Sequence, residues 1–146
     1  MQNFDVVIVG AGISGIGAAC HLQQSCPDKT FTIRESRKQI VGTWDLFQYP
    51  GIRSDSDMHT LGFNFKPWTA AKSIADGPSI KSYLQETIAE RGLAKHVQHE
   101  HKVRSAEWSS DSSTWTVTTD HGGKTEQFCC NFLMMCSGYY NYDTPY

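Results

Sequence analysis

The sequence lacks long hydrophobic runs and an excess of charge of one sign, and each absence excludes a class of protein. No apolar run approaches the roughly 18 residues of a membrane-spanning helix. The net charge is −2 over 146 residues, which argues against a surface dedicated to nucleic acid or acidic lipid. The first residues also lack the basic start and apolar core of a signal peptide, so we expect a cytoplasmic protein.

The sequence also lacks cysteine patterns that bind metal or form a redox pair. Its five cysteines show no zinc-binding spacing, no C-x-x-C and no C-x4-C, which argues against a flavin disulfide reductase. We interpret them as small free side chains in a reducing compartment. His99 and His101 are expected on one face of a strand, but no third and fourth ligand accompany them, so we expect no metal site.

What the sequence does contain is the start of a β–α–β unit. The apolar run Phe4 to Val9 predicts a parallel strand buried on both faces, and it ends at Gly10. Small, helix-compatible residues then continue to Pro27 and predict a helix. The stretch from Thr30 to Glu35 predicts a second strand, which completes the unit.

The rest of the chain predicts a small antiparallel meander after a long irregular segment. The segment from Ser36 to Gly77 has no steady period, and compact domains rarely hold so long a connection unless it binds something. A helix follows, with Pro78 in its first turn and Gly92 at its end. Turn residues then separate strands expected at 96–108, 114–119 and 124–128, and a further apolar strand is expected at 131–138.

The turn after the first strand carries the spacing G-x-G-x-x-G, and each glycine in it has a physical task. Gly10 permits the tight turn, Gly12 lets the main chain approach a pyrophosphate, and Gly15 lets the helix lie close to the sheet. The phosphates would meet the free N–H groups and the positive end of the helix, and Ser14 could add a hydroxyl donor. This context predicts a dinucleotide-binding site.

An acidic residue stands at the position where such a site holds the ribose. Glu35 follows Gly15 by twenty residues, at the end of the second strand. Its carboxylate would accept hydrogen bonds from ribose hydroxyls and repel a 2′-phosphate, which favours FAD or NAD over NADP as the first ligand. Arg34 and Arg37 beside it could instead favour an extra phosphate, and that alternative stays open.

The segments "GTWDLFQYPGIRSDSDM", "IADGPSIKSYLQETIAERGL" and "CSGYY" resemble the class B flavoprotein monooxygenases, which include flavin-containing and Baeyer–Villiger monooxygenases. The resemblance implies an α/β, Rossmann-like, two-dinucleotide flavoprotein fold with FAD and NADPH as cofactors. It further implies NADPH- and O2-dependent oxygenation of a small-molecule ketone, or of a sulfur or nitrogen centre, through a flavin C4a-(hydro)peroxide.

The resemblance also assigns roles to residues beyond the glycine turn. Asp55 would lie beside the isoalloxazine and nicotinamide, and Arg53 and Asp55 are the candidate catalytic residues. Val103 would meet the adenine through its backbone. The other expected cofactor contacts lie in the long segment and at the end of the last strand: Gly42, Thr43, Trp44, Ser54, Ser137 and Gly138.

The chain departs from the family in two ways. Val41 stands where the family has a glycine, so its side chain could crowd the flavin phosphates or ribose. Family members are several times longer, so we expect residues 1–146 to be the N-terminal part of an incomplete FAD-binding domain without the NADPH-binding domain, with an exposed sheet edge that permits self-association. Two alternatives stay open: a catalytically inactive, truncated nucleotide-binding module, and a different two-dinucleotide flavin oxidoreductase.

Overall fold

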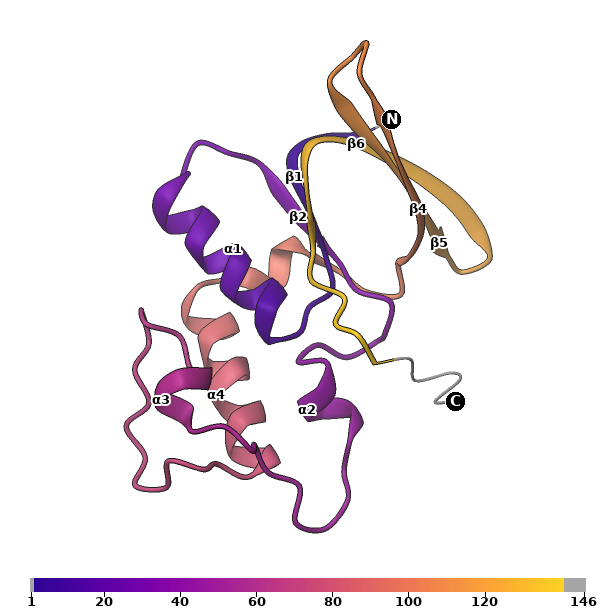
Figure 1. The fold of residues 1–146 in the computed structure, drawn as a ribbon. Helices are drawn as coiled ribbons and strands as arrows, with labels where there is room; N and C mark the ends of the chain where they lie inside the picture. The colour runs from indigo at the N-terminus through magenta and orange to yellow at the C-terminus, as the bar shows by residue number, and fades with distance from the viewer. Residues whose placement is uncertain (1, 141–146) are drawn as a thin grey trace.

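The computed structural model describes residues 2–140, which form one six-stranded sheet with helices against it (Figure 1). The strands are β1 (Gln2–Val9), β2 (Phe31–Arg34), β3 (Val97–Gln98), β4 (Lys102–Ser109), β5 (Thr114–His121) and β6 (Lys124–Met135). The α-helices are α1 (Ile13–Ser25), α2 (Thr43–Leu46), α3 (Met58–Leu61) and α4 (Gly77–Glu90), and a 3-10 helix η1 spans Leu93–His96.

The sheet has the order β3-β2-β1-β6-β5-β4, and it changes character at β6. The pairs β3–β2, β2–β1 and β1–β6 are parallel, whereas β6–β5 and β5–β4 are antiparallel. The expected fold class, a Rossmann-like parallel sheet with a small meander, is therefore confirmed. The meander continues the parallel sheet because β6 belongs to both parts.

Two strands predicted separately, at 124–128 and 131–138, are in fact one strand. β6 runs unbroken from Lys124 to Met135. Its first part pairs with β5 up to Cys130, and from Phe128 onward it pairs with β1. No glycine or proline interrupts residues 124–135, so nothing in the sequence forces the strand to end between its two partners.

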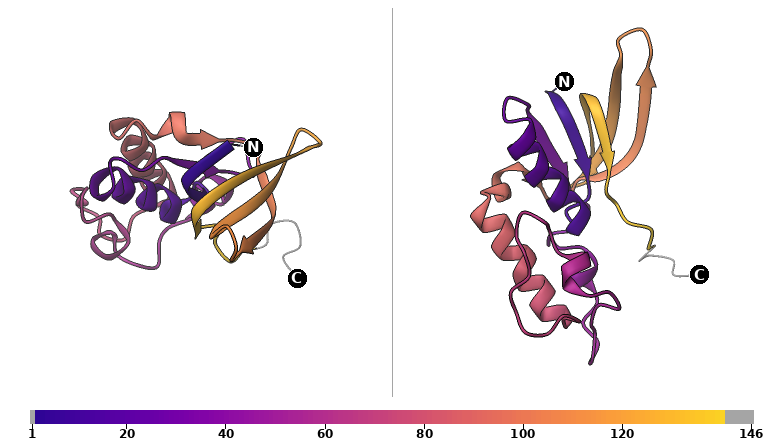
Figure 2. Two further views of the ribbon diagram at one scale, coloured as in Figure 1. Left: turned by 90° about the horizontal axis from the view of Figure 1, so that it is seen from above. Right: turned by 60° about the vertical axis from the view of Figure 1, so that its left-hand side comes forward.

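Two of the parallel strands are buried on both faces, β1 over Val6–Val9 and β2 over its whole length, as the apolar run in β1 predicted. Ile8 and Ile33 are fully buried in the cluster that α1 and α4 share with the sheet, together with Ile16 and Leu84. Val7 belongs to a second, smaller cluster on the face toward the meander. Figure 2 shows the two layers: the helices lie on one side of the parallel strands and the meander turns away on the other.

The helix predicted after Pro78 is present as α4. Asp76 caps it by accepting a hydrogen bond from the Ser79 N–H at 2.8 Å, and Pro78 lies in the first turn. Just past its end, Gly92 adopts φ +61°, a left-handed conformation that glycine reaches at little cost. The N-cap, the proline and the glycine together place both ends of α4.

The long irregular segment contains the short helices α2 and α3, which its sequence did not predict. Asp57 caps α3 and accepts hydrogen bonds from the Thr60 N–H and hydroxyl. The Tyr83 hydroxyl holds the segment against α4, because it accepts from the Phe63 N–H and donates to the Lys66 carbonyl. Helices of four residues are too short to show a hydrophobic period.

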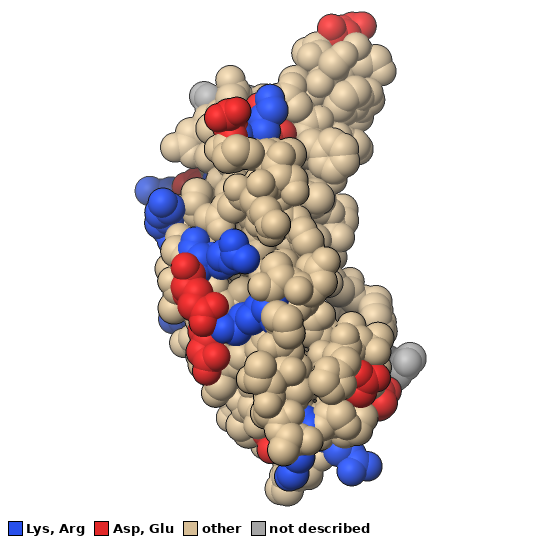
Figure 3. Space-filling model, turned by 90° about the vertical axis from the view of Figure 1, so that its left-hand side faces the viewer, with Lys and Arg blue, Asp and Glu red and all other residues tan. Residues whose placement is uncertain are grey.

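The charged side chains do not gather by sign on the face drawn in Figure 3, where Lys and Arg alternate with Asp and Glu. Among the ion pairs, the Lys66 amino group lies 3.7 Å from the Glu86 carboxylate and 2.6 Å from that of Glu90. Across residues 2–140, no helix combines the length and the apolar character needed to cross a bilayer.

Candidate functional site

A cavity of about 810 Å³, called here the glycine pocket, opens where the parallel strands β1, β2 and β6 end. Gly10 follows β1, Glu35 follows β2 and Ser137 follows β6, and all three residues line it. In α/β sheets of this kind, ligands bind in the crevice outside the carboxyl ends of the strands. The long segment after β2 supplies the opposite wall, from Ser36 to Leu61.

The structure brings the predicted cofactor residues together in this pocket, although they are up to 128 positions apart (from Gly10 to Gly138). Those that line it are Gly10, Gly12, Ser14, Glu35, Gly42, Thr43, Trp44, Arg53, Ser54, Asp55, Val103, Ser137 and Gly138. Gly15 is the exception, because it is buried under the turn and does not line the pocket. The individual contacts of these residues with a cofactor stay predictions.

The three glycines of the turn are needed for different reasons. A Cβ on Gly10 would lie 2.5 Å from the Cys136 carbonyl oxygen, and one on Gly15 would lie 1.9 Å from the Gly10 carbonyl oxygen. A Cβ on Gly12 would meet only the Gly42 Cα, at 3.9 Å. Gly10 and Gly15 are therefore required by the protein's own packing, whereas the missing side chain of Gly12 leaves open space in the pocket.

That open space lies at the N-terminus of α1. Gly12 is the N-cap residue, no side chain caps the helix, and its first turn contains no acidic residue. The first N–H groups of a helix have no partner within the helix, and they carry its partial positive charge. The structure thus presents a main-chain cradle suited to an anionic group such as a diphosphate.

Glu35 is buried beside this cradle and holds it in shape. One carboxylate oxygen accepts a hydrogen bond from the Ala11 N–H at 2.8 Å, and the other accepts from the Arg37 N–H at 2.9 Å. Its residual exposure is 5%. A carboxylate offers about four acceptor positions, so Glu35 can bind ribose hydroxyls in addition to these two main-chain donors.

The residues before α2 fold directly onto the glycine turn. The Val41 N–H donates to the Ala11 carbonyl at 2.8 Å, and a Cβ on Gly42 would lie 3.2 Å from the Gly12 Cα. Val41 adopts φ +81° and is almost fully buried. This conformation is unfavourable for a β-branched residue, which gives a backbone reason for the glycine that the family has at this position.

An ion-pair network fixes α2 beneath the pocket. Asp45 is buried, and its two oxygens lie 2.5 Å from Arg37 and 2.8 Å from Lys81 of α4. Burial alone would raise the pKa of Asp45, but the hydrogen bonds and charges of Lys81 and Arg37 outweigh it and lower the pKa below its usual value. Arg37, one of the two arginines that could have favoured an extra phosphate, is therefore engaged by protein groups.

The candidate catalytic residues lie on the far wall of the pocket, on a loop anchored to the chain before α4. The Ser54 N–H donates to the Ala75 carbonyl at 2.9 Å, and Arg53 forms an isolated bridge with Asp76. Ser54 is buried, whereas Arg53 and Asp55 are exposed. Their side chains are therefore available to a ligand while their backbone is held in place.

His101 is a pocket residue that the sequence did not predict. His101 was expected in a strand beside His99, but His99 and Glu100 form a turn with Glu100 at φ +58°, and β4 begins only at Lys102. His101 instead lines the pocket, with its Nε2 3.3 Å from Glu126. Within the described part of the chain, no three His, Cys, Asp or Glu side chains are placed to bind a metal.

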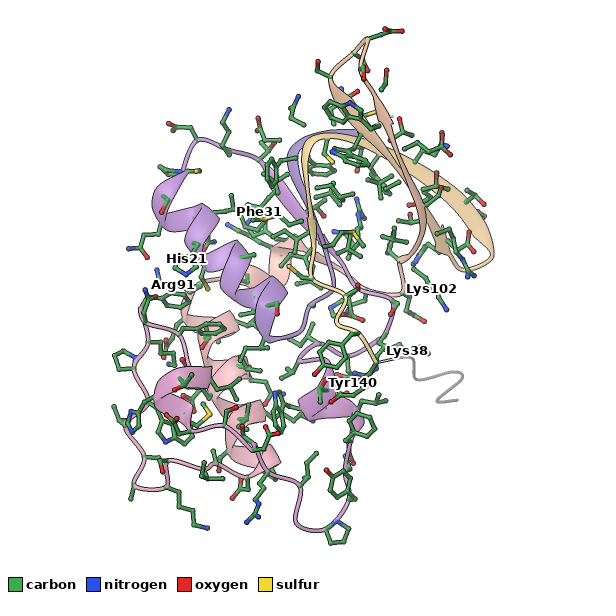
Figure 4. The ribbon with its side chains drawn as sticks, viewed as in Figure 1. His21, Phe31, Lys38, Arg91, Lys102 and Tyr140 are labelled. Atoms are coloured by element: carbon green, nitrogen blue, oxygen red, sulfur yellow. The ribbon has the colours of Figure 1, made fainter. Side chains whose placement is uncertain are left out.

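Aromatic side chains also line the pocket. The Tyr140 ring meets the Phe47 ring edge-on, with 6.2 Å between the ring centroids. Figure 4 shows Tyr140 over α2, where the chain leaves β6 and crosses the long segment. Phe47, Tyr49 and Trp44 line the same wall, which suits the apolar rings of a large cofactor.

Comparison with known proteins identifies the family. Residues 8–78 match the model of an NAD(P)-binding Rossmann-like domain, and residues 73–145 match the flavin-binding monooxygenase-like family. The chain belongs to the flavin-binding monooxygenase-like family. The class B monooxygenase resemblance seen in the sequence is thereby confirmed.

Relatives and solved structures agree with this assignment. The chain is 59% identical to the FAD-containing monooxygenase EthA of Mycolicibacterium smegmatis over 99% of its own length, and 50% identical to the putative FAD-containing monooxygenase MymA of Mycobacterium tuberculosis. It spans about 30% of the length of each of these relatives.

Two solved structures resemble the fold closely. A steroid monooxygenase bound to NADP superposes with a TM-score of 0.84 at 27% identity, over 94% of this chain and 26% of that one. A cyclohexanone monooxygenase also gives a TM-score of 0.84, at 28% identity, over 96% of this chain and 28% of that one. The monooxygenase architecture therefore extends over nearly all of this chain.

Because Gly12 and Gly15 have different surroundings, substitution by alanine should affect FAD binding at Gly12 and stability at Gly15. Gly15→Ala forces a Cβ against the Gly10 carbonyl and should lower the free energy of unfolding by about 1–3 kcal/mol. Gly12→Ala meets no protein atom closely and should leave that free energy within about 0.5 kcal/mol, but it should weaken FAD binding about tenfold or more by filling the cradle. Denaturant titration and equilibrium binding measure the two quantities.

Each variant is the control for the other. Equal stability of the two would contradict the packing role of Gly15. Unchanged FAD affinity in Gly12→Ala would show that the open space at the start of α1 does not receive the diphosphate.

Proposed function

We propose that this chain binds FAD in the glycine pocket and forms the N-terminal part of the FAD-binding domain of an NADPH- and O2-dependent monooxygenase. The observation that carries the proposal is the uncapped start of α1, open to the pocket between Glu35 and the long segment. The cavity volume of about 810 Å³ falls within the roughly 300–1,000 Å³ of small-molecule sites. The relatives named above, which are FAD-containing monooxygenases, support the choice of FAD.

The residues that line the pocket would suit each part of FAD. The first N–H groups of α1 would take the diphosphate, and Glu35 would accept from the ribose hydroxyls. The wall formed by Trp44 and the loop at Arg53–Asp55 would face the isoalloxazine ring. When bound, FAD supplies hydride acceptance from NADPH and the activation of O2, and the protein positions it.

Arg53 and Asp55 would orient the nicotinamide of NADPH. A carboxylate can accept from the nicotinamide amide, which helps to fix the ring for hydride transfer. A guanidinium on the same loop would favour negative charge on the reduced flavin. The proposed substrate of the longer enzyme is a small molecule with a ketone, sulfur or nitrogen centre, and a cytoplasmic location stays a prediction.

Titration of the purified chain with FAD, followed by anaerobic addition of NADPH, tests this function. We expect each chain to bind one FAD, and the bound FAD to show the absorbance bands of a protein-bound flavin. Rapid bleaching by NADPH would mean that the residues present also bind the nicotinamide. FAD binding without bleaching would favour the alternative of an FAD-binding module that cannot turn over, and failure to bind FAD would contradict the proposal.

We also propose that the isolated chain self-associates through the open edge of β6. Beyond Cys130, β6 keeps β1 on one side, but no strand of residues 2–140 pairs with its other side. Phe132 is 61% exposed and Met135 63% exposed along this stretch. Unpaired strand edges with apolar side chains pair readily with another chain, and a second copy offers the same edge.

Sedimentation velocity over a range of concentrations measures this association. The wild type should form dimers as its concentration rises, and Phe132→Lys should shift it to monomer, because a charge on the edge disfavours pairing. Trp108→Lys, at an exposed position of β4, is the matched control and should still dimerise. A wild type that stays monomeric throughout would contradict this mode of association.

A further inference from the structure

Arg34, the last residue of β2, is a buried cation that the proposed roles leave unused. It pairs in the sheet with Val9 on one side and Gln98 on the other, and only 3% of its surface is exposed. Arginine is rarely buried unless its donors are paired, because the loss of hydration is costly. The position of Arg34 therefore needs an explanation.

Protein groups replace the lost hydration of the Arg34 guanidinium only in part. The guanidinium carbon lies 3.6 Å from the centroid of the Phe128 ring, a close cation–π contact. The Nε atom is buried and has no hydrogen-bond partner, the one such side-chain atom among the described residues. Burial lowers the pKa of Arg34 to about 10, although the charge of Glu126 opposes this. The side chain thus stays protonated at neutral pH with donor capacity to spare.

Arg34 also lines the glycine pocket. Glu35, the next residue in the chain and expected at the ribose, lines it too, as does Val103, which is expected at the adenine. Arg37, three residues further along the chain, is engaged by Asp45 and by the Gly42 carbonyl, so it is not free to serve a ligand in the same way. A buried donor group that borders a ligand cavity indicates that the ligand supplies the missing acceptor.

We propose that the Arg34 guanidinium donates a hydrogen bond to an acceptor atom of the adenosine half of the bound dinucleotide. The proposal rests on the FAD-binding function above and adds a specificity-determining residue to it. A neutral acceptor of the adenine or ribose fits better than an additional phosphate, because the buried Glu35 carboxylate next to it would repel a second anion. The Phe128 ring holds the guanidinium in place before the ligand arrives.

Binding of FAD, ADP and FMN to Arg34→Met, Arg34→Lys and the wild type tests this role. Arg34→Met should raise the Kd for FAD and for ADP about tenfold, the effect of losing a hydrogen bond to a charged group. FMN has no adenosine, so its Kd should change less than about twofold. Arg34→Lys keeps the charge but loses the planar arrangement of donors. Its Kd values for FAD and ADP should therefore lie between those of the wild type and those of Arg34→Met.

A melting experiment on the ligand-free chain separates this role from a structural one. Removal of a buried cation that the protein compensates only in part should leave the thermal midpoint of Arg34→Met unchanged or higher. Arg104→Met removes an exposed arginine paired with Asp120 outside the pocket, and it should leave all three affinities unchanged. A wild type that fails to bind FAD would refute the proposed function itself.

Three results would overturn the role of Arg34 while the wild type still binds FAD. The first is an unchanged Kd for ADP in Arg34→Met. The second is an equal loss of FMN and ADP binding, or a variant that melts early or fails to fold, because Arg34 would then be a structural residue. The third is a loss confined to 2′-phosphorylated ligands such as 2′,5′-ADP, which would assign Arg34 to an extra phosphate.

Discussion

The rest of the pocket depends on the close approach of bare main chain around the turn from β1 into α1. The Cys136 carbonyl lies where a side chain of Gly10 would be, and the Gly10 carbonyl lies where a side chain of Gly15 would be. These contacts bring the end of β6 and the start of α1 onto one turn. Because the protein fills the space at Gly10 and Gly15 but not at Gly12, the turn remains both rigid and open to an anion.

Glu35 extends this constraint to the neighbouring strand and to the long segment. Its carboxylate binds the Ala11 N–H on the glycine turn and the Arg37 N–H at the start of the segment. Arg37 then reaches Asp45, and Asp45 reaches Lys81 on α4. A continuous chain of polar contacts therefore connects the expected ribose site with the helix that packs behind the pocket, so the long segment is held before any cofactor binds.

Features with strong local signals could be predicted from the sequence. The glycine spacing, the apolar run in β1 and the capped ends of α4 each depend on residues close together in the chain, and the structure shows all three. The family resemblance identified the long segment as a pocket wall. The comparison with known proteins supports the family on which this prediction rested. The cofactor contacts of the individual residues are still predictions.

Features set by tertiary partners could not be predicted. The continuity of β6 depends on β1 taking over from β5 along its length, and the local sequence does not encode that exchange. The turn at His99 and Glu100 breaks a segment whose composition suited a strand. The sequence indicated Arg34 only as a residue that could favour an extra phosphate. Its burial and its unpaired Nε depend on tertiary packing, which includes the ring of Phe128, far along the chain.

The central claim is that a diphosphate binds the first N–H groups of α1. Amide chemical-shift mapping of the isotopically labelled chain during titration with ADP tests this claim most directly. The account predicts that the largest shifts fall on the N–H groups of Gly12, Ile13 and Ser14. ADP binding that leaves these amides unshifted and moves another surface would contradict it.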